Sequence, residues 1–272
     1  MSSVSPSMLI NGHAVTTIEA TDRGLHYGDG LFETMRCENG RVRWLAYHLQ
    51  RLASGCQRLR IQMPDPNLLQ SELSALAVHH KRALLKLVIT RGPMVRRGYR
   101  PASTEQPTRI VSSHTWPDDD GAPLRLGISS ISLADNPLLA GIKHLSRLEN
   151  VLAQQEAGER GLDEVVMCCS SGEVVCGSMS NLIVVSEKGI LTPALNNAGV
   201  HGVMRALSLS AAAATGISLA IDRVNTAQLQ TAKAIYCSNI RWGLRRVEQF
   251  DGRQLGSEAR IAQLEEWIYA QP

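Results

Sequence analysis

The residue whose type and position most suggest chemistry is Lys143, which follows an apolar run and precedes an apparent helix. The chain has 23 arginines and five lysines, so a lysine at this place is not explained by surface charge alone. Loss of hydration lowers the pKa of an amine, and a Schiff base with an aldehyde requires such a lysine. A lysine that caps a strand end with its stem buried is the alternative, and the segment alone leaves both interpretations open.

Pyridoxal phosphate is an aldehyde cofactor that also needs donors for its phosphate and a group opposite its pyridine nitrogen. A glycine-containing run at residues 197–205 leads directly into a predicted helix, so the amides of Val203 and Met204 would point at an anion. Arg51, on a helix predicted over residues 44–60, is a second phosphate candidate. An ordinary glycine-rich loop and a solvated arginine are the competing interpretations.

Composition argues against several other classes of protein. The net charge of +3 gives no nucleic-acid footprint, and no apolar run reaches the roughly 18 residues that span a bilayer. Cys168, Cys169 and Cys176 have no histidines nearby in the sequence, so we predict no metal site. The N-terminal residues lack the features of a signal peptide, and the six cysteines do not suggest a disulfide framework. We therefore expect reduced thiols and a cytoplasmic protein that binds neither nucleic acid nor membrane.

The first half of the chain reads as a compact set of strands and helices. Asn11-Gly12 and Asn39-Gly40 each predict a hairpin turn. Residues 44–60 repeat apolar side chains at helical spacing, and residues 83–90 and 109–114 read as buried strands. The proline- and aspartate-rich stretch that follows is typical of a linker.

The second half combines short strands with three longer predicted helices, over residues 145–159, 203–215 and 257–269. Mixed strands and helices in two lobes indicate an α+β fold. We predict a small N-terminal domain over 1–116, a linker over 117–123 and a larger C-terminal domain over 124–272.

Several motifs, spread over nearly the whole chain, resemble the branched-chain aminotransferase-like, or fold type IV, family of pyridoxal phosphate enzymes. They are LING at residues 9–12, DRGLHYGDGLFET at 22–34, HLQRL at 48–52, and AGIKHLSRLE at 140–149. The last run, and the arginines and tyrosine at residues 91–99, resemble the family's aminodeoxychorismate lyases more than its aminotransferases. The resemblance implies a smaller N-terminal α/β lobe, a larger lobe with a β-barrel-like core, and a homodimer in which the partner completes the site.

The resemblance also implies roles for individual residues. Lys143 would form the internal aldimine and then act as acid and base, while Arg51 and the amides of Val203 and Met204 hold the phosphate. Asn239 and Ile240 would line the same end of the cofactor.

One departure from the family pattern concerns the group that faces the pyridine nitrogen. The family usually has a glutamate there, and the run VCGSMSNL at residues 175–182 has Cys176 in its place. A carboxylate keeps that nitrogen protonated, because an opposite charge raises its pKa. A lyase whose substrate has its own leaving group should tolerate this loss better than a transaminase does.

The resemblance to the lyases implies conversion of 4-amino-4-deoxychorismate to p-aminobenzoate and pyruvate in folate biosynthesis. The substrate carries two carboxylates, for which Arg97 and Tyr99 are the first candidates, and Tyr27 is expected to line the pocket. Thr34 is a candidate for proton relay, although a β-branched residue in that place also suits a strand. A D-amino-acid or branched-chain aminotransferase, and a weakened cofactor-binding paralogue, are the alternatives.

Overall fold

The computed structural model describes residues 7–102, 105–118 and 121–272. The chain divides into two compact units: unit 1 comprises Met1–Asp118 and Ile142–Ser146, and unit 2 comprises Asp119–Gly141 and Arg147–Pro272. The sequence analysis grouped Ile142–Ser146 with the second domain, because sequence distance alone does not reveal which sheet a short segment joins. Two positions of the predicted linker, 119 and 120, lie outside the described residues. The predicted domain limits themselves stay a prediction.

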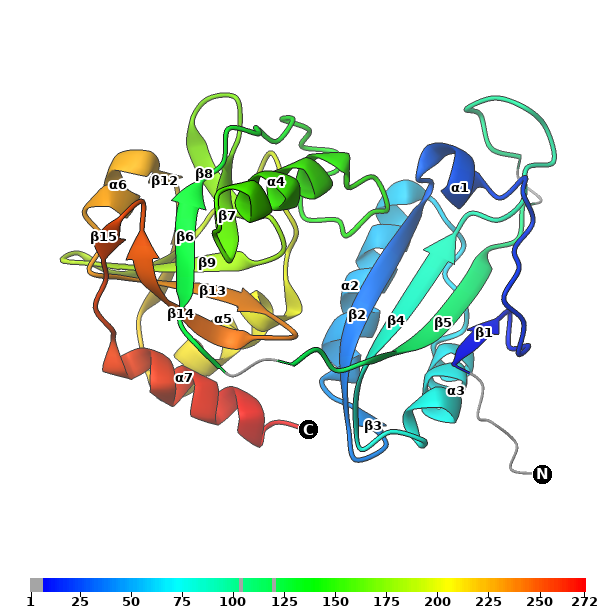
Figure 1. The fold of residues 1–272 in the computed structure, drawn as a ribbon. Coiled ribbons are helices and arrows are strands. Elements are labelled where there is room, and N and C mark those ends of the chain that lie inside the picture. Colours follow the sequence, from blue (N-terminus) through cyan, green and yellow to red (C-terminus); the bar gives the residue numbers. More distant parts are fainter. Residues whose placement is uncertain (1–6, 103–104, 119–120) are drawn as a thin grey trace. The chain divides into compact units, whose positions relative to one another are not determined.

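Unit 1 is built on an antiparallel sheet with strand order β1-β5-β4-β2-β3 (Figure 1). Its strands are β1 (Met8–Ile10), β2 (Gly30–Glu38), β3 (Arg41–Val42), β4 (Arg82–Thr90) and β5 (Thr108–Thr115). Its helices are α1 (Arg23–Tyr27), α2 (Leu45–Leu59) and α3 (Pro66–Ala77).

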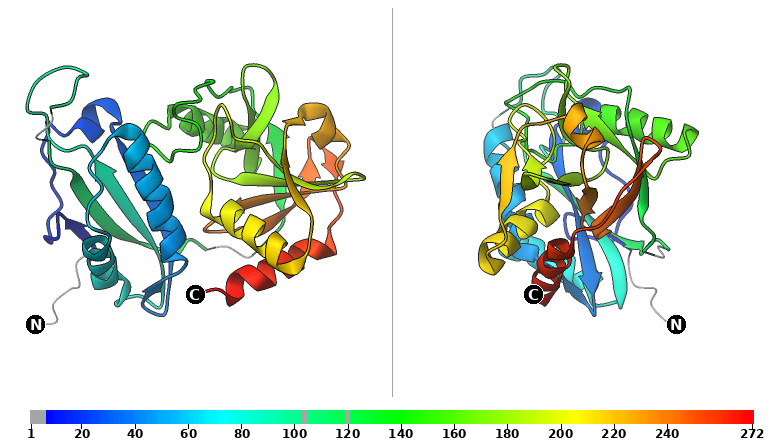
Figure 2. Two further views of the ribbon diagram at one scale, coloured as in Figure 1. Left: turned by 180° about the vertical axis from the view of Figure 1, so that it is seen from behind. Right: turned by 90° about the vertical axis from the view of Figure 1, so that its left-hand side faces the viewer.

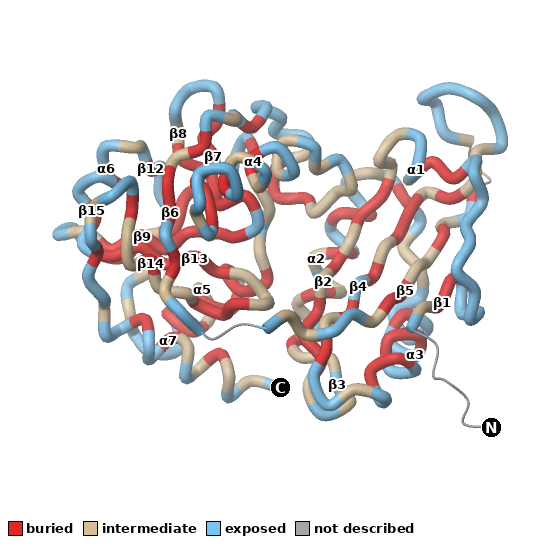
Figure 3. The backbone as a smooth tube through the Cα atoms, viewed as in Figure 1, coloured by how far each residue is buried: buried red, intermediate tan, exposed pale blue. Residues whose placement is uncertain are grey.

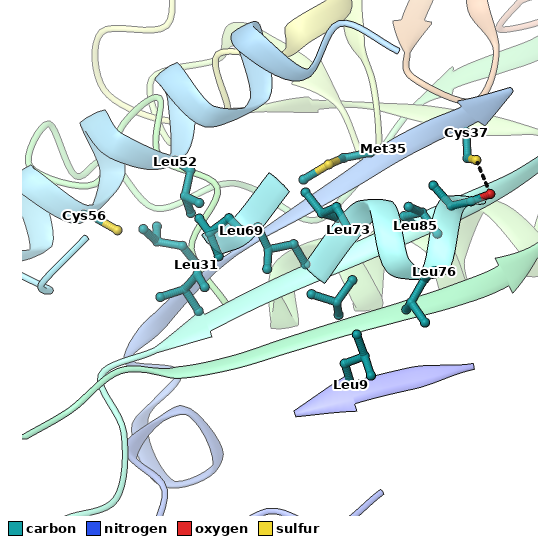
Figure 4. Packing of buried hydrophobic residues seen from close by; sticks show 14 of the residues in the cluster. Leu9, Leu31, Met35, Cys37, Leu52, Cys56, Leu69, Leu73, Leu76 and Leu85 are labelled. Carbon is teal, nitrogen blue, oxygen red and sulfur yellow. Dashed lines mark hydrogen bonds between the residues drawn. The ribbon is translucent and has the colours of Figure 1, made fainter. Parts of the chain in front are cut away.

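The core of unit 1 lies between the sheet and the two longer helices, α2 and α3. Leu69, Leu73 and Leu76 recur along α3 at three- and four-residue spacing and are fully buried. Figure 4 shows them beside side chains of β1, β2 and β4 and of helix α2. Burial of this apolar face fixes the helices to one side of the sheet.

Both Asn-Gly turns form as predicted. Asn11 and Asn39 have φ values of 51° and 49°, and the glycines that follow have 83° and 76°. Positive φ at both central residues defines the tight turn whose twist matches that of paired strands. The second turn joins β2 to β3 and so sets the register of the sheet.

The segment around Lys143 is held against β2. The Phe32 N–H donates to the Lys143 carbonyl, and the Leu145 N–H donates to the Gly30 carbonyl, each at 3.0 Å. A Cβ at Gly30 would lie 2.7 Å from Leu145 Cδ1 and 2.6 Å from the Ile89 carbonyl oxygen, so glycine permits the close approach of this segment to β2. The helix predicted from residue 145 therefore begins later, as α4 (Leu148–Glu159), because Leu145 is engaged with β2.

Unit 2 contains a curled mixed sheet with the path β11-β10-β9-β13-β14-β6-β7-β8-β12, and β15 pairs with β14 (Figure 1). Its strands are β6 (Leu124–Ile128), β7 (Glu164–Cys168), β8 (Glu173–Gly177), β9 (Asn181–Ser186), β10 (Gly189–Pro193), β11 (Leu219–Asp222), β12 (Val224–Asn225), β13 (Ala234–Asn239), β14 (Gly243–Phe250) and β15 (Arg253–Gln254). Strands β7, β9 and β13 are buried almost throughout, as Figure 3 shows, which explains their continuous apolar sequences.

The helices of unit 2 are α4 (Leu148–Glu159), α5 (Val203–Thr215), α6 (Thr226–Gln230) and α7 (Ala259–Ala270). Helices α5 and α7 lie side by side (Figure 2). Helix α5 covers the range that the sequence predicts. Within the described residues, no helix is both long enough and apolar enough to cross a bilayer.

Candidate active site

The Lys143 side chain lies over an aromatic ring of β2. Its Nζ is 4.3 Å from the centroid of the Phe32 ring, and the residue is half-buried. An ammonium over a ring face makes a cation–π contact. A second amine, that of Lys86 on β4, lies 5.4 Å from the same centroid. The amine of Lys143 is thus held beside the strand to which its own backbone is bonded.

Thr34 lies within β2, a place that suits its β-branched side chain. Side chains alternate along a strand, so Thr34 shares the face of Phe32, and Glu33 points to the opposite face. Lys86 is the cross-strand partner of Thr34. The structure therefore places Thr34 on the strand face that Lys143 contacts, and its part in proton relay stays a prediction.

The opposite face of β2 carries a buried charge cluster formed by Glu33, His48 and Arg51. Arg51 donates to both oxygens of the Glu33 carboxylate, with its Nε at 2.7 Å from Oε1. His48 Nδ1 lies 2.5 Å from Oε2 of the same carboxylate. Glu33 is 1% exposed and His48 is fully buried. The predicted phosphate arginine is thus fixed by a carboxylate, and its contact with a phosphate stays a prediction.

The protonation states in this cluster follow from burial and charge. Burial by itself would raise the pKa of Glu33, but the Arg51 charge and the hydrogen bonds from His48 and Arg51 outweigh it and lower the pKa to about 2. Burial lowers the pKa of His48 and outweighs the opposing effect of Glu33. Near pH 7 the cluster therefore holds an ionised Glu33, a cationic Arg51 and a neutral His48.

Two of the predicted substrate residues, Tyr27 and Tyr99, meet within unit 1. Their ring centroids are 5.4 Å apart, and the guanidinium carbon of Arg23 lies 4.9 Å from the Tyr27 centroid. Tyr99 is 85% exposed, and Arg97 is exposed in the same loop. The roles of Arg97, Tyr99 and Tyr27 in substrate binding stay predictions.

In unit 2, the N-terminus of α5 is shaped by glycine and by Asn181. The Gly202 N–H donates to Asn181 Oδ1 at 3.1 Å, and Asn181 Nδ2 donates to the Val200 carbonyl at 2.9 Å. A Cβ at Gly202 would lie 2.0 Å from Asn181 Oδ1. Gly202 is the N-cap of the helix and provides no side-chain cap for the amides of Val203 and Met204. Amides at the positive end of a long helix, reached through a glycine loop, suit a phosphate.

Cys176 lies on β8 beside this glycine loop. The residue is buried in a cluster with Val175, Leu195 and Ala198. A Cβ added to Gly199 would meet Val175 at 2.7 Å and the Cys176 Sγ at 3.8 Å. The structure therefore brings Cys176 to the loop that precedes α5, which is compatible with the position the resemblance gives it.

Asn239 ends β13 and closes the turn to β14. Its Oδ1 accepts hydrogen bonds from the Arg241 and Trp242 amides at 3.0 and 2.8 Å, and its Nδ2 lies 3.4 Å from the Met179 carbonyl. Ile240 is half-buried in the same turn. The side chain of Asn239 thus orders a turn, and cofactor contact by this pair stays a prediction.

Glu164 is a buried carboxylate that sequence reasoning did not single out. It accepts hydrogen bonds from the amides of Ser178 and Met179, at 3.0 and 3.2 Å, and from the hydroxyls of Ser178 and Ser180. Burial raises its pKa despite these hydrogen bonds. The carboxyl holds the loop that leads into Asn181, and so supports the α5 N-terminus indirectly.

Glu33, His48 and Arg23 were also missed. All three lie inside motifs that the sequence analysis quoted, at residues 22–34 and 48–52. Motif membership was a signal of importance, but their partners become evident only when β2, α2 and the loop of residues 96–100 are brought together.

Known proteins are similar to this chain over most of its length. The family model "Amino-transferase class IV" matches residues 30–250. An aminodeoxychorismate lyase of Vibrio harveyi is 30% identical over 234 residues, which cover 85% of this chain and 86% of that protein. A D-alanine aminotransferase of Bacillus licheniformis is 27% identical over 261 residues, covering 93% and 91%. The crystal structure of 4-amino-4-deoxychorismate lyase from Pseudomonas aeruginosa has a TM-score of 0.91 and 37% identity, covering 97% of this chain and 98% of that one.

Each unit, taken by itself, offers a group that suits the cofactor. Unit 1 holds the Lys143 amine beside β2, and unit 2 holds a glycine-shaped helix N-terminus suited to a phosphate. The chain belongs to the class IV aminotransferase family, whose members have the type IV fold and are pyridoxal phosphate enzymes.

Proposed function

We propose that this protein is an aminodeoxychorismate lyase, which releases p-aminobenzoate and pyruvate from 4-amino-4-deoxychorismate. The observation that carries the proposal is the likeness to the P. aeruginosa lyase, at 37% identity over 97% of the chain. The run at residues 140–149, which surrounds Lys143, supports it from the sequence.

Lys143 is the proposed acid and base. When bound, pyridoxal phosphate supplies an aldehyde for the substrate amine and a ring that withdraws electrons from the adjacent carbon. The Lys143 amine takes the proton from the amine-bearing ring carbon. The electron pair of that C–H bond then forms a ring double bond, and the enolpyruvyl oxygen leaves with the electrons of its C–O bond. The ring becomes aromatic, and the departing enolate takes up a proton to give pyruvate.

Other residues are proposed to position the reactants. Arg51 and the amides of Val203 and Met204 hold the phosphate, and Asn239 and Ile240 lie toward the same end. Thr34 relays a proton, on the strand face that Lys143 contacts. Arg97 and Tyr99, with Tyr27, meet the substrate carboxylates, for which a guanidinium and a phenol are suitable donors.

The leaving group of the substrate makes a thiol at position 176 easier to tolerate. A transaminase depends on the protonated cofactor ring to stabilise its carbanion, and a thiol supports that protonation less well than a carboxylate does. In the elimination, departure of the enolpyruvyl oxygen removes the electrons that a transaminase must stabilise on the cofactor ring. Cys176 therefore favours the lyase over the aminotransferases among the relatives.

We also propose a homodimer in the cytoplasm. Leu148, Val151 and Leu152 form an apolar face on α4 and are 78%, 59% and 51% exposed, with Leu138 nearby in the chain at 81%. A contiguous exposed apolar face of this kind suits a second copy of the chain. None of the six cysteines, all of which lie in the described residues, forms a disulfide, which suits a reducing compartment. Sedimentation at micromolar protein concentration distinguishes a dimer from a monomer.

The test of function combines borohydride reduction with a pyruvate-release assay. We expect reduction to attach the cofactor to the peptide that contains Lys143, and pyruvate to form without any added oxo acid. Lys143→Ala should abolish both results. Lys86→Ala, which removes the other amine near Phe32, should preserve both. Amine transfer to pyruvate or 2-oxoglutarate, without release of p-aminobenzoate, would instead identify an aminotransferase. Cofactor binding without either activity would identify an inert paralogue.

A further inference from the structure

The loop of residues 96–100 carries Arg97 and Tyr99 and is exposed throughout. An exposed loop with several arginines is expected to sample many conformations, which would weaken its contacts with a substrate. The structure contains two sets of contacts that oppose this freedom. One set holds the start of the loop, and the other holds its tip.

Backbone hydrogen bonds with Thr21 and Arg23, at the start of α1, hold the residues that lead into the loop. The Arg23 N–H donates to the Gly92 carbonyl, and the Met94 N–H donates to the Thr21 carbonyl, each at 2.9 Å. Gly92 has a φ of 101°, and a Cβ there would lie 1.8 Å from the Gln106 carbonyl oxygen. The chain can therefore follow this path only with glycine at position 92.

The Arg23 side chain holds the tip. Its Nη1 donates to the Gly98 carbonyl at 3.0 Å, and its Nη2 donates to the Tyr99 carbonyl at 2.8 Å. Arg23 is 3% exposed, although the loop that it binds is open to solvent. A buried guanidinium with two neighbouring carbonyls as acceptors uses its planar fork to fix both peptide units at once.

Asp29 sets the orientation of this guanidinium. Its Oδ2 accepts from Arg23 Nε at 2.8 Å and from Arg91 Nε at 2.8 Å. Arg91 also donates to the carbonyls of Leu59 and Arg60, at the end of α2. Burial acts to raise the pKa of Asp29, but the hydrogen bonds from Arg91 and Arg23 outweigh it and lower the pKa. The tip of the loop is thus connected through Arg23 and Asp29 to the body of unit 1.

We propose that Arg23, oriented by Asp29, is a positioning residue that fixes the loop of residues 96–100 and thereby presents Arg97 and Tyr99 to the substrate carboxylates. The inference rests on the proposed function for its substrate. It predicts that loss of Arg23 weakens substrate binding without removing any group that contacts the substrate or the cofactor.

Limited trypsin digestion of the protein without cofactor tests the anchoring directly. Trypsin can cut after Arg96 and Arg97, and cleavage within a loop follows its local opening. Arg23→Gln should speed cleavage at these two bonds about tenfold, as expected when charge-assisted hydrogen bonds to the loop are lost. The matched control is Arg109→Gln, because Arg109 pairs with Glu72 of α3 instead of the loop. Its cleavage rate should equal that of the wild type.

Steady-state kinetics of the cofactor-loaded enzyme tests the consequence for the substrate. Arg23→Gln should raise KM about tenfold and leave kcat and the cofactor absorbance nearly unchanged, since a mispositioned loop weakens binding. Arg23→Lys keeps the charge beside Asp29 but cannot reproduce the fork, so its effects should be intermediate. If thermal denaturation shows that Arg23→Gln does not fold, Arg23→Lys replaces it in both measurements.

Unchanged cleavage in the Arg23 variants would overturn the anchoring, whatever the catalytic result. Faster cleavage with an unchanged KM would overturn the link between the loop and the substrate. A wild-type enzyme that releases no pyruvate would defeat the proposed function, while the cleavage rates would still decide whether Arg23 holds the loop.

Discussion

Replacing Glu33 with glutamine removes the charge at the centre of the Glu33–His48–Arg51 cluster and nearly preserves the shape of the side chain. The carboxylate is 1% exposed and accepts hydrogen bonds from both Arg51 and His48. In the variant, a half-buried guanidinium loses its counter-ion. Removal of one partner from a buried ion pair is strongly destabilising because the other charge remains.

The pKa of Glu33 gives the magnitude and its dependence on pH. A pKa lowered from 4.5 to about 2 corresponds to about 3 kcal/mol of stability at pH 7. The folded-state value is the lower one, so this contribution is complete above the unfolded value of 4.5 and is lost as the pH falls toward 2. About 1 kcal/mol of this contribution to stability should remain near pH 3.

Urea denaturation of the wild type and Glu33→Gln, both without cofactor, measures the difference at each pH. We expect the variant to be less stable by about 3 kcal/mol at pH 7 and by about 1 kcal/mol near pH 3. Glu38→Gln is the control, because the Glu38 side chain is 27% exposed in its pair with Arg36 and should contribute less than about 1 kcal/mol. An equal loss for Glu33→Gln at both pH values would refute the assignment of this stability to an ionised Glu33.

Two further substitutions test unit 2. Gly202→Ala should lower the free energy of unfolding by about 1–3 kcal/mol and weaken cofactor binding, because the new Cβ would lie 2.0 Å from Asn181 Oδ1. Thermal denaturation measures the first effect, and absorbance titration with the cofactor measures the second. Gly158→Ala, where a Cβ meets nothing within 4 Å, is the control, and equal behaviour of the two variants would contradict the steric argument. Cys176→Glu should raise pyruvate-dependent transamination more than lysis, measured as the ratio of the two rates. Greatly increased lysis with unchanged transamination would refute the role given to the leaving group.

Local features of the chain were the ones that the sequence predicted well. The Asn-Gly turns formed because positive φ is a property of those residues and their immediate neighbours. Helix α5 formed over the predicted range, with a glycine at each end to define its limits. The family and its cofactor were identified from motifs spread along the chain, and the comparisons confirm both.

Predictions failed or stayed incomplete where distant segments meet. Residues 145–147 were predicted as helix, but Leu145 bonds to Gly30, a partner more than a hundred positions away in the chain. Arg51 was predicted from its own helix, and the Glu33 carboxylate that fixes it comes from β2. Helical periodicity and turn propensity contain no information about such pairings.

The sequence by itself determined the turns, most helices and the class of enzyme, and it singled out the lysine proposed for its chemistry, because each is encoded in residue type and short spacing. The tertiary structure decided which charges are neutralised and which loops are fixed: Glu33 with Arg51, Glu164 with the serines of its loop, and Arg23 with the carbonyls of Gly98 and Tyr99. The physical reason is that burial and hydrogen bonding act between atoms that only the folded chain brings within about 3 Å of one another.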